Sequence, residues 1–317
     1  MNEQNICFED CLDTIFTINR MARENLGEDS FFCATDEGCA LVGVFDGCGG
    51  LGARRYEKFD GHTGAYIASR AVSGAVHDWF FCKGKNTDSA GEMTKNLKTY
   101  IEKAYAICEK YAVERIKIRG SMVRKFPTTL AMVYAKKVSE GILAHIFWAG
   151  DSRVYLLDSD GLAQLTVDDT DVTDALENLT CDGAMNNVLS SDGNFQIHSK
   201  TILLTQPALL FAATDGCFGY VSSPMEFEYL LVKTLVNGKT PEEFKRNLEE
   251  EMGEYAGDDL TMGIMSFFFG DFPTTRRFFE NRLHFLEKKY ISVMEKQEKE
   301  VQALWEEYKV PYQRYLR

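Results

Sequence analysis

The stretch ALVGVFDGCGG, at residues 40–50, decides how this chain folds. Its first six residues are all apolar, which predicts a strand covered on both faces, because a strand with one face in water alternates apolar and polar side chains. Asp46 and Gly47 follow where the strand ends. A strand end holds a carboxylate rigidly at the rim of a sheet, and a glycine lets the backbone approach a ligand closely. We therefore interpret this stretch as a buried strand that presents Asp46 at a sheet edge.

The arrangement of an apolar run beside an acidic residue recurs along the chain. The further cases are Asp151 after residues 142–149, Asp215 after 208–213, Asp258 and Asp259 before 260–269, and the acidic pair Glu28 and Asp29. An isolated Asp-Gly pair is more often a solvated turn, and Asp151 could simply pair with Arg153 across a turn. Four strand-end aspartates would need four coincidences, so we expect these carboxylates to converge at one site.

Converging carboxylates repel one another, and a bound divalent cation relieves that repulsion. Mg²⁺ and Mn²⁺ prefer oxygen ligands, which are the ligands that aspartate and glutamate provide. The five histidines are scattered, at residues 62, 77, 145, 198 and 284, which argues against a His-rich zinc site. The sequence therefore predicts Mn²⁺ or Mg²⁺ as the cofactor.

The composition argues against nucleic-acid and membrane partners. The net charge of -13 repels phosphate backbones and anionic membranes. No apolar run approaches the ~20 residues needed to cross a bilayer, and the N-terminus lacks the pattern of a signal peptide. Nine cysteines, an odd number without a CxxC pair, are typical of reduced thiols. We therefore expect a cytoplasmic protein.

The order of apolar runs and helical segments predicts packed sheets with helices outside them. Two helices come early, hairpin-like strands and two more helices follow, and a last strand ends the series, unlike a doubly wound parallel sheet. The strands are expected at 40–45, 128–135, 142–149, 154–157, 201–204, 208–213 and 260–269, and the helices at 62–82, 92–118, 225–236 and 241–254. Thr240 and Pro241 predict the N-cap and first position of the last helix.

A charged, aromatic-studded segment follows the last strand, and we expect two units, 1–272 and 273–317. Apolar residues in steps of four and three predict an amphipathic helix there. They are Phe279, Leu283, Leu286, Tyr290 and Val293, with Leu304 and Tyr308 after the polar stretch 295–300. Two interpretations remain open: the stripe packs back onto the first unit as a covering helix, or it forms a short coiled coil that dimerises the protein or docks a partner.

Six short blocks, taken together, resemble the type 2C metal-dependent protein phosphatases (PPM family) of the bacterial type. They are RENLGED (23–29), FDGCGG (45–50), PTTLAMV (127–133), WAGDSRVYLL (148–157), AATDGCFG (212–219) and GDDLTM (257–262). Each block alone is a weak signal, but all six occur in the family's order over roughly residues 15–270. The resemblance implies an α+β fold, in which an antiparallel β-sandwich is flanked by helices in α-β-β-α layers, with a metal site at one edge.

The resemblance also implies hydrolysis of phosphoserine and phosphothreonine in phosphorylated protein substrates, by water activated between two metal ions. By motif position, Asp46 resembles the carboxylate that bridges both ions, with the Gly47 carbonyl on one of them. Asp215 and Asp258 resemble further ligands of the first ion, Glu28 and Asp29 the acidic pair of the second, and Asp151 with Asp215 the ligands of a weaker third ion. Arg23 resembles the arginine that binds the substrate phosphate. Two adjacent divalent ions lower the pKa of a bridging water and neutralise phosphoryl oxygens, which is consistent with these roles.

Four departures from the family pattern leave alternatives open. Cys48 replaces the usual His or Met and is either an apolar filler or a redox-sensitive thiol. Asp169 replaces a histidine of the family in LTVDDTD (165–171). An insertion of ten residues creates a second Asp-Gly-His-x-Gly element at 60–64, but Asp60 follows no buried strand, so Asp46 is preferred. Arg23 lies five positions before Glu28, one more than the spacing usual in the family, so Arg20 is an alternative to it.

Two other functions are compatible with parts of the pattern. A catalytically silent phosphatase-like binding module would have no reason to keep mutually repelling carboxylates together. A two-metal phosphodiesterase or nuclease would need to attract polyanionic substrates, which the net charge of -13 disfavours.

Overall fold

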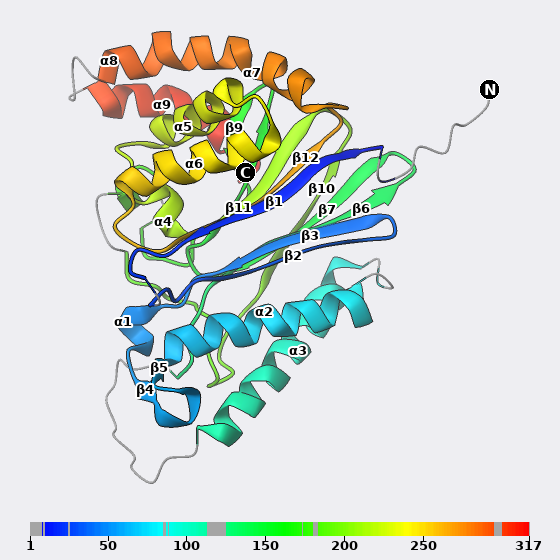
Figure 1. Cartoon of the computed structure of the whole chain (residues 1–317), viewed down its shortest axis with the longest axis vertical. Coiled ribbons are helices and arrows are strands. Elements are labelled where there is room, and N and C mark those ends of the chain that lie inside the picture. The colour runs from blue at the N-terminus through cyan, green and yellow to red at the C-terminus, as the bar shows by residue number, and fades with distance from the viewer. Residues whose placement is uncertain are drawn as a thin grey trace.

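The chain folds into two antiparallel sheets packed face to face (Figure 1). The computed structural model describes residues 8, 10–24, 26–84, 87, 89–112, 125–172, 174–179, 183–294 and 300–316. The strands of the first sheet lie in the order β1 (Leu12–Arg20), β12 (Leu260–Phe267), β11 (Ala208–Ala213), β8 (Arg153–Asp158) and β9 (Gly161–Gln164). Those of the second lie in the order β10 (His198–Leu204), β7 (Gly141–Ala149), β6 (Leu130–Val138), β3 (Cys39–Phe45) and β2 (Ser30–Asp36).

The burial of β3 on both faces explains why its sequence is apolar without interruption. Val42 and Val44 lie in the cluster between the two sheets, together with Leu210 of β11. Leu41 and Phe45, which alternate with them, lie in the cluster beneath the helices on the outer face of the second sheet. Both faces of β3 are therefore covered, as the sequence predicted.

Helices cover the outer face of each sheet, so the predicted antiparallel sandwich flanked by helices is confirmed (Figure 1). The second sheet is covered by α2 (Gly64–Cys82) and α3 (Ala90–Tyr111), and the first by α5 (Pro224–Asn237) and α6 (Pro241–Tyr255). Thr240 caps α6 as predicted, because its hydroxyl accepts a 3.2 Å hydrogen bond from the Glu243 amide. Residues 113–118, which the sequence placed in a helix, lie outside the described residues.

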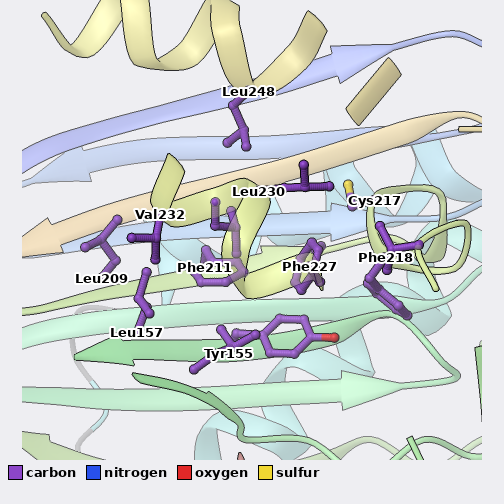
Figure 2. Packing of buried hydrophobic residues seen from close by; sticks show 14 of the residues in the cluster. Tyr155, Leu157, Leu209, Phe211, Cys217, Phe218, Phe227, Leu230, Val232 and Leu248 are labelled. Carbon is purple, nitrogen blue, oxygen red and sulfur yellow. The ribbon is translucent and has the colours of Figure 1, made fainter. Parts of the chain in front are cut away.

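The cluster under α5 joins that helix to the first sheet. Phe227 of α5 faces the strands, with its ring centroid 5.4 Å from that of Tyr155 in β8. Phe211 of β11 stacks on Tyr155 at 5.2 Å, and Figure 2 shows the three rings with Leu230 of α5 around them. This packing fixes α5 above the strands that end near the acidic residues.

The segment after β12 folds back onto α5. It consists of α7 (Phe272–Leu286), a π-helical turn (Glu287–Ile291), α8 (Ser292–Met294) and α9 (Val301–Tyr312). Phe279, Trp305 and Tyr308 are buried in the same cluster as Phe227. The apolar stripe is thus covered within the chain itself; most of the polar stretch 295–300 lies outside the described residues.

The remaining elements are short and lie mainly around the sheet ends. They are α1 (Gly49–Gly52), β4 (Arg55–Tyr56), η1 (Glu57–Phe59), β5 (His62–Thr63), η3 (Glu177–Leu179) and α4 (Asp215–Phe218). None of the helices in the described ranges has both the length and the apolar character needed to span a bilayer.

Candidate metal centre and phosphate cleft

Asp46 is held at the end of β3 by the blocks that precede β6 and β8. Its amide donates a 3.1 Å hydrogen bond to Oγ1 of Thr129, and its carbonyl accepts one of 2.6 Å from Oγ1 of Thr128. Oγ1 of Thr129 lies 2.6 Å from Oγ of Ser152. The Thr-Thr and Gly-Asp-Ser-Arg blocks therefore fix the backbone that carries the Asp46 carboxylate.

Gly47 occupies a position where no side chain fits. A Cβ atom there would lie 2.7 Å from the carbonyl oxygen of Glu28 and 2.8 Å from that of Ala65. Real Cβ atoms do not approach backbone oxygens so closely, and neither backbone segment can yield cheaply. The glycine thus lets the turn after β3 lie directly against the Glu28 backbone and the start of α2.

The predicted acidic ligands, with the exception of Asp29, line one cavity of about 480 Å³. Asp46 enters it from the end of β3, Asp151 from the turn between β7 and β8, and Asp215 from the end of β11. Asp258 and Asp259, just before β12, and Glu28, just before β2, complete the acidic lining. Residues separated by more than 200 positions are therefore brought to one edge of the sandwich.

Burial and mutual repulsion raise the pKa of three of these carboxyls, those of Asp46, Asp151 and Asp215. Burial, followed by the Asp215, Asp29 and Asp151 carboxylates, raises the pKa of Asp46 well above its ordinary value. Burial and then Asp215 raise the pKa of Asp151 to about 7. Burial also raises the pKa of Asp215, and Asp258 adds to that shift. The cavity concentrates negative charge whose repulsion a cation would relieve.

The donor set fits a hard divalent cation. Oδ1 of Asp151 is buried and has no hydrogen-bond partner among the described residues. An unsatisfied carboxylate oxygen among several other carboxylates is the kind of ligand that Mg²⁺ or Mn²⁺ prefers. Over those same described ranges, no three His, Cys, Asp or Glu side chains form a ready-made metal-binding group, so ion binding would have to draw the carboxylates together.

The alternative in which Asp151 pairs with Arg153 is not what the structure adopts. Arg153 is buried and donates to Asp168 instead, with Nη2 2.7 Å from Oδ2 and Nε 3.0 Å from Oδ1. The Arg153 guanidinium is thus already bound to another carboxylate. Asp168 lies beside the departure that the sequence singled out, Asp169, yet its role was missed because it is 15 residues from Arg153.

The acidic pairs divide their work between the cavity and the backbone. Glu28 lines the cavity and accepts a hydrogen bond from Thr63, whereas Asp29 is buried and accepts one of 2.9 Å from Thr214. Asp258 is exposed and lines the cavity, while Asp259 accepts the amides of Ala22 at 2.8 Å and Glu28 at 2.6 Å. Asp29 is thus buried behind Glu28, whereas Asp259 both lines the cavity beside Asp258 and holds the backbone of Ala22 and Glu28.

Arg23 lies in a second cleft of about 400 Å³ that adjoins the first. The two clefts share Glu28, Asp258 and Asp259 in their linings. Arg20, the alternative, points elsewhere, because its Nη1 donates to the carbonyl of Glu249 in α6 at 3.4 Å. Between the two arginines, only Arg23 is positioned beside the acidic cavity.

The ten-residue insertion forms a small hairpin in which β4 pairs with β5. Asp60 lies at its turn with a positive φ of 52°, is exposed, and is not among the residues lining either cleft. The hairpin instead brings Arg55 and His62 into the second cleft. Sequence reasoning missed Arg55, because nothing in the insertion's local pattern indicates which of its charged residues turns inward.

The two remaining departures, Cys48 and Asp169, are half-buried at the same edge. Cys48 lines the acidic cavity, and burial together with the carboxylates of Asp46, Asp151 and Asp215 raises the pKa of its thiol well above the usual range. The raised pKa disfavours the reactive thiolate while these carboxylates carry their charge without bound cations. Asp169 anchors its loop, because Oδ2 accepts the Gly150 amide at 3.0 Å.

A sequence model described as protein phosphatase 2C matches residues 19–253, about three-quarters of the chain. The chain belongs to this family. It is therefore a metal-dependent protein serine/threonine phosphatase. No curated protein sequence matches it.

Solved structures of bacterial phosphatases share the fold. The chain is similar to the serine/threonine phosphatase Stp1 from Staphylococcus aureus, with 18% identity and a TM-score of 0.59 over 80% of this chain and 94% of that one. The S. agalactiae serine/threonine phosphatase matches at 18% identity and a TM-score of 0.58, over 80% and 98% of the two chains. A bacterial serine phosphatase matches at 17% identity and 0.60, over 80% and 97%. The family match ends at residue 253, before α7–α9 begin.

Proposed function

We propose that this phosphatase hydrolyses phosphoserine and phosphothreonine in proteins at a centre that holds two Mn²⁺ or Mg²⁺ ions, with a weaker third. The observation that carries the proposal is the cavity in which Asp46, Asp151, Asp215, Asp258 and Glu28 meet. The raised pKa of Asp46, Asp151 and Asp215 and the unsatisfied oxygen of Asp151 support it. A protein without a cation to bind would gain nothing from confining these charges.

In this proposal each acidic residue has a distinct part. Asp46 and the Gly47 carbonyl would help to hold the first two ions. Asp215 and Asp258 would hold the first ion with them, and Asp151 with Asp215 would hold the third. Glu28 and Asp29 serve the second, and the buried position of Asp29 suits a role through water or through positioning of its neighbours. When bound, the ions lower the pKa of a water molecule and neutralise phosphoryl oxygens.

Arg23 binds the phosphate in this proposal. The chain carries a net charge of -13, so a phosphoprotein needs a local cation to approach the site. The guanidinium of Arg23 lines a cleft that shares three acidic residues with the metal cavity, and an arginine can bind phosphate oxygens through two parallel hydrogen bonds.

The cysteines support a cytoplasmic location for this phosphatase. Seven cysteines in the described ranges are free thiols, which suits the reducing cytoplasm. Reversal of a kinase's product would make the enzyme a component of signalling.

The experiment is an assay of the purified full chain on a phosphothreonine peptide with Mn²⁺, Mg²⁺ or excess EDTA. We expect turnover with either metal and none with chelator. A parallel assay on a cyclic dinucleotide tests the phosphodiesterase alternative. Hydrolysis of the dinucleotide alone would contradict the proposal, and metal-independent binding of the phosphopeptide without turnover would favour the silent module.

A further inference from the structure

The second cleft, beside the metal cavity, contains two arginines from different parts of the chain. Arg23 follows β1, and Arg55 belongs to the hairpin formed by the insertion at 51–60. No salt bridge in the described ranges joins either guanidinium to a carboxylate. Glu28, Asp258 and Asp259 line the same cleft, but Glu28 and Asp258 would bind the ions and Asp259 accepts two backbone amides. With Arg23 assigned to the substrate phosphate, the Arg55 guanidinium is left to receive a further anion.

The hairpin that carries Arg55 is held in place by its own contacts and by contacts with α2. Its Nη1 donates a 2.9 Å hydrogen bond across the hairpin to the carbonyl of Gly61. The His62 ring stacks on Tyr66 of α2, with centroids 3.8 Å apart and planes 6° apart. Thr63 caps α2 by accepting the Tyr66 amide at 3.1 Å. The hairpin is thereby docked on the start of α2, and the guanidinium loses little further freedom when it binds.

Arg55 lies in a cleft whose lining overlaps that of the metal cavity. It lines the second cleft together with Glu28, Asp258 and Asp259, which also line the metal cavity. A substrate whose phosphoryl group reaches the metal cavity would therefore place neighbouring residues against Arg55.

We propose that the second cleft is a specificity subsite for a second anionic group of the substrate, a few residues from the phosphoserine or phosphothreonine, with Arg55 as its main contact. The proposal rests on the phosphatase function proposed above. The anion is either a second phosphoryl group or the carboxylate of aspartate or glutamate, since a guanidinium fork accepts both.

The test compares three phosphothreonine peptides of the same sequence that differ at the flanking positions. One carries alanine, one glutamate, and one a non-hydrolysable phosphonate analogue of phosphoserine. The full chain is assayed with Mn²⁺, and kcat/KM is compared between peptides. We expect the favoured anionic peptide to exceed the alanine peptide by about three- to tenfold, with the advantage shrinking at high salt.

Two variants test whether the preference for the anionic peptide depends on Arg55. Arg55→Gln should bring the ratio of kcat/KM values to about one. Arg54→Gln is the matched control, because Arg54 is the adjacent arginine, does not line the cleft, and lies 5.3 Å from the Tyr56 ring centroid. It removes the same charge from the hairpin and should leave the ratio unchanged.

The outcomes separate this proposal from the one on which it rests. Equal kcat/KM for all three peptides would overturn the subsite while leaving the phosphatase intact. Loss of the preference in Arg54→Gln as well as Arg55→Gln would reduce it to a general charge effect and also overturn it. Failure to hydrolyse any peptide with Mn²⁺ would count against the phosphatase function itself. A preference for glutamate over phosphonate, or the reverse, identifies the anion.

Discussion

The Tyr308 hydroxyl donates a 2.6 Å hydrogen bond to Oε2 of Glu228, and so connects the last helix of the chain to a carboxylate buried in α5. Arg282 of α7 donates to the same carboxylate through Nε at 2.7 Å and Nη2 at 2.8 Å. The Leu162 amide of β9 donates to Oε1 at 3.1 Å. A single buried charge thus joins four elements, and it is tolerable there only because every partner is present.

Removal of one partner should destabilise the fold strongly. Arg282→Met leaves Glu228 buried without a counter-ion, and we expect a loss of about 3–5 kcal/mol in the free energy of unfolding. Tyr308→Phe removes one donor only and should cost about 1–3 kcal/mol. Urea denaturation measures both. Arg277→Met, an exposed arginine on the same helix, is the control and should change stability little; equal losses in Arg277→Met and Arg282→Met would contradict the argument.

Deletion of 273–317 tests the two interpretations of the C-terminal segment. The deletion would expose the apolar face of α5 that contacts Phe279, Trp305 and Tyr308, so we expect an insoluble or partly unfolded protein. Light scattering on the full chain should report a monomer. A dimeric full chain that becomes a folded, active monomer on truncation would instead support the coiled coil, and the boundary at residue 272 would then mark an independent unit.

Substitution of the aspartate in each of the two Asp-Gly elements tests the choice of Asp46 over Asp60. Asp46→Asn should lower turnover by more than about a hundredfold, because even outer partners of metal ligands contribute about 10–100-fold. Asp60→Asn, at the exposed turn of the hairpin, should retain turnover within about twofold. Circular dichroism confirms that both variants fold. An inactive Asp60→Asn beside an active Asp46→Asn would reverse the assignment.

The stability of the chelated protein should fall as pH rises. A carboxyl whose pKa in the folded state exceeds its value of about 3.9 in the unfolded state keeps its proton longer when folded, so the folded state loses stability as pH rises through that window. For Asp151 the window extends to about 7. With EDTA, we expect a lower Tm at pH 8 than at pH 5.

Asp151→Asn removes one of these groups. With EDTA, the free energy of unfolding should then fall less steeply with pH, by up to about 1.4 kcal/mol per pH unit within the window. Mn²⁺ replaces the protons and should reverse the trend, because metal binding is favoured when the ligands are deprotonated. With EDTA, an identical dependence of Tm on pH in wild type and Asp151→Asn would contradict the prediction. It would mean that ionisation of Asp151 does not destabilise the metal-free protein.

The sequence by itself determined the buried strands and the carboxylates at their ends. Continuous apolar runs predicted β3, β11 and β12, because a strand covered on both faces needs apolar residues at every position. It also predicted the cap of α6, since Thr240 acts on an amide only three residues away. Strand β1 was missed, because its sequence LDTIFTINR mixes polar and apolar residues as a half-buried edge strand does.

Only the tertiary structure decided which residues meet. It directed Arg153 to Asp168 rather than Asp151 and Arg20 to the carbonyl of Glu249. It also placed Arg23 and Arg55 in the cleft that adjoins the acidic cavity. It also buried the C-terminal stripe on α5. Local patterns report the burial and periodicity of neighbouring residues. Contacts across 15 to 250 positions depend instead on strand pairing and helix docking, which the periodicity of single segments does not encode.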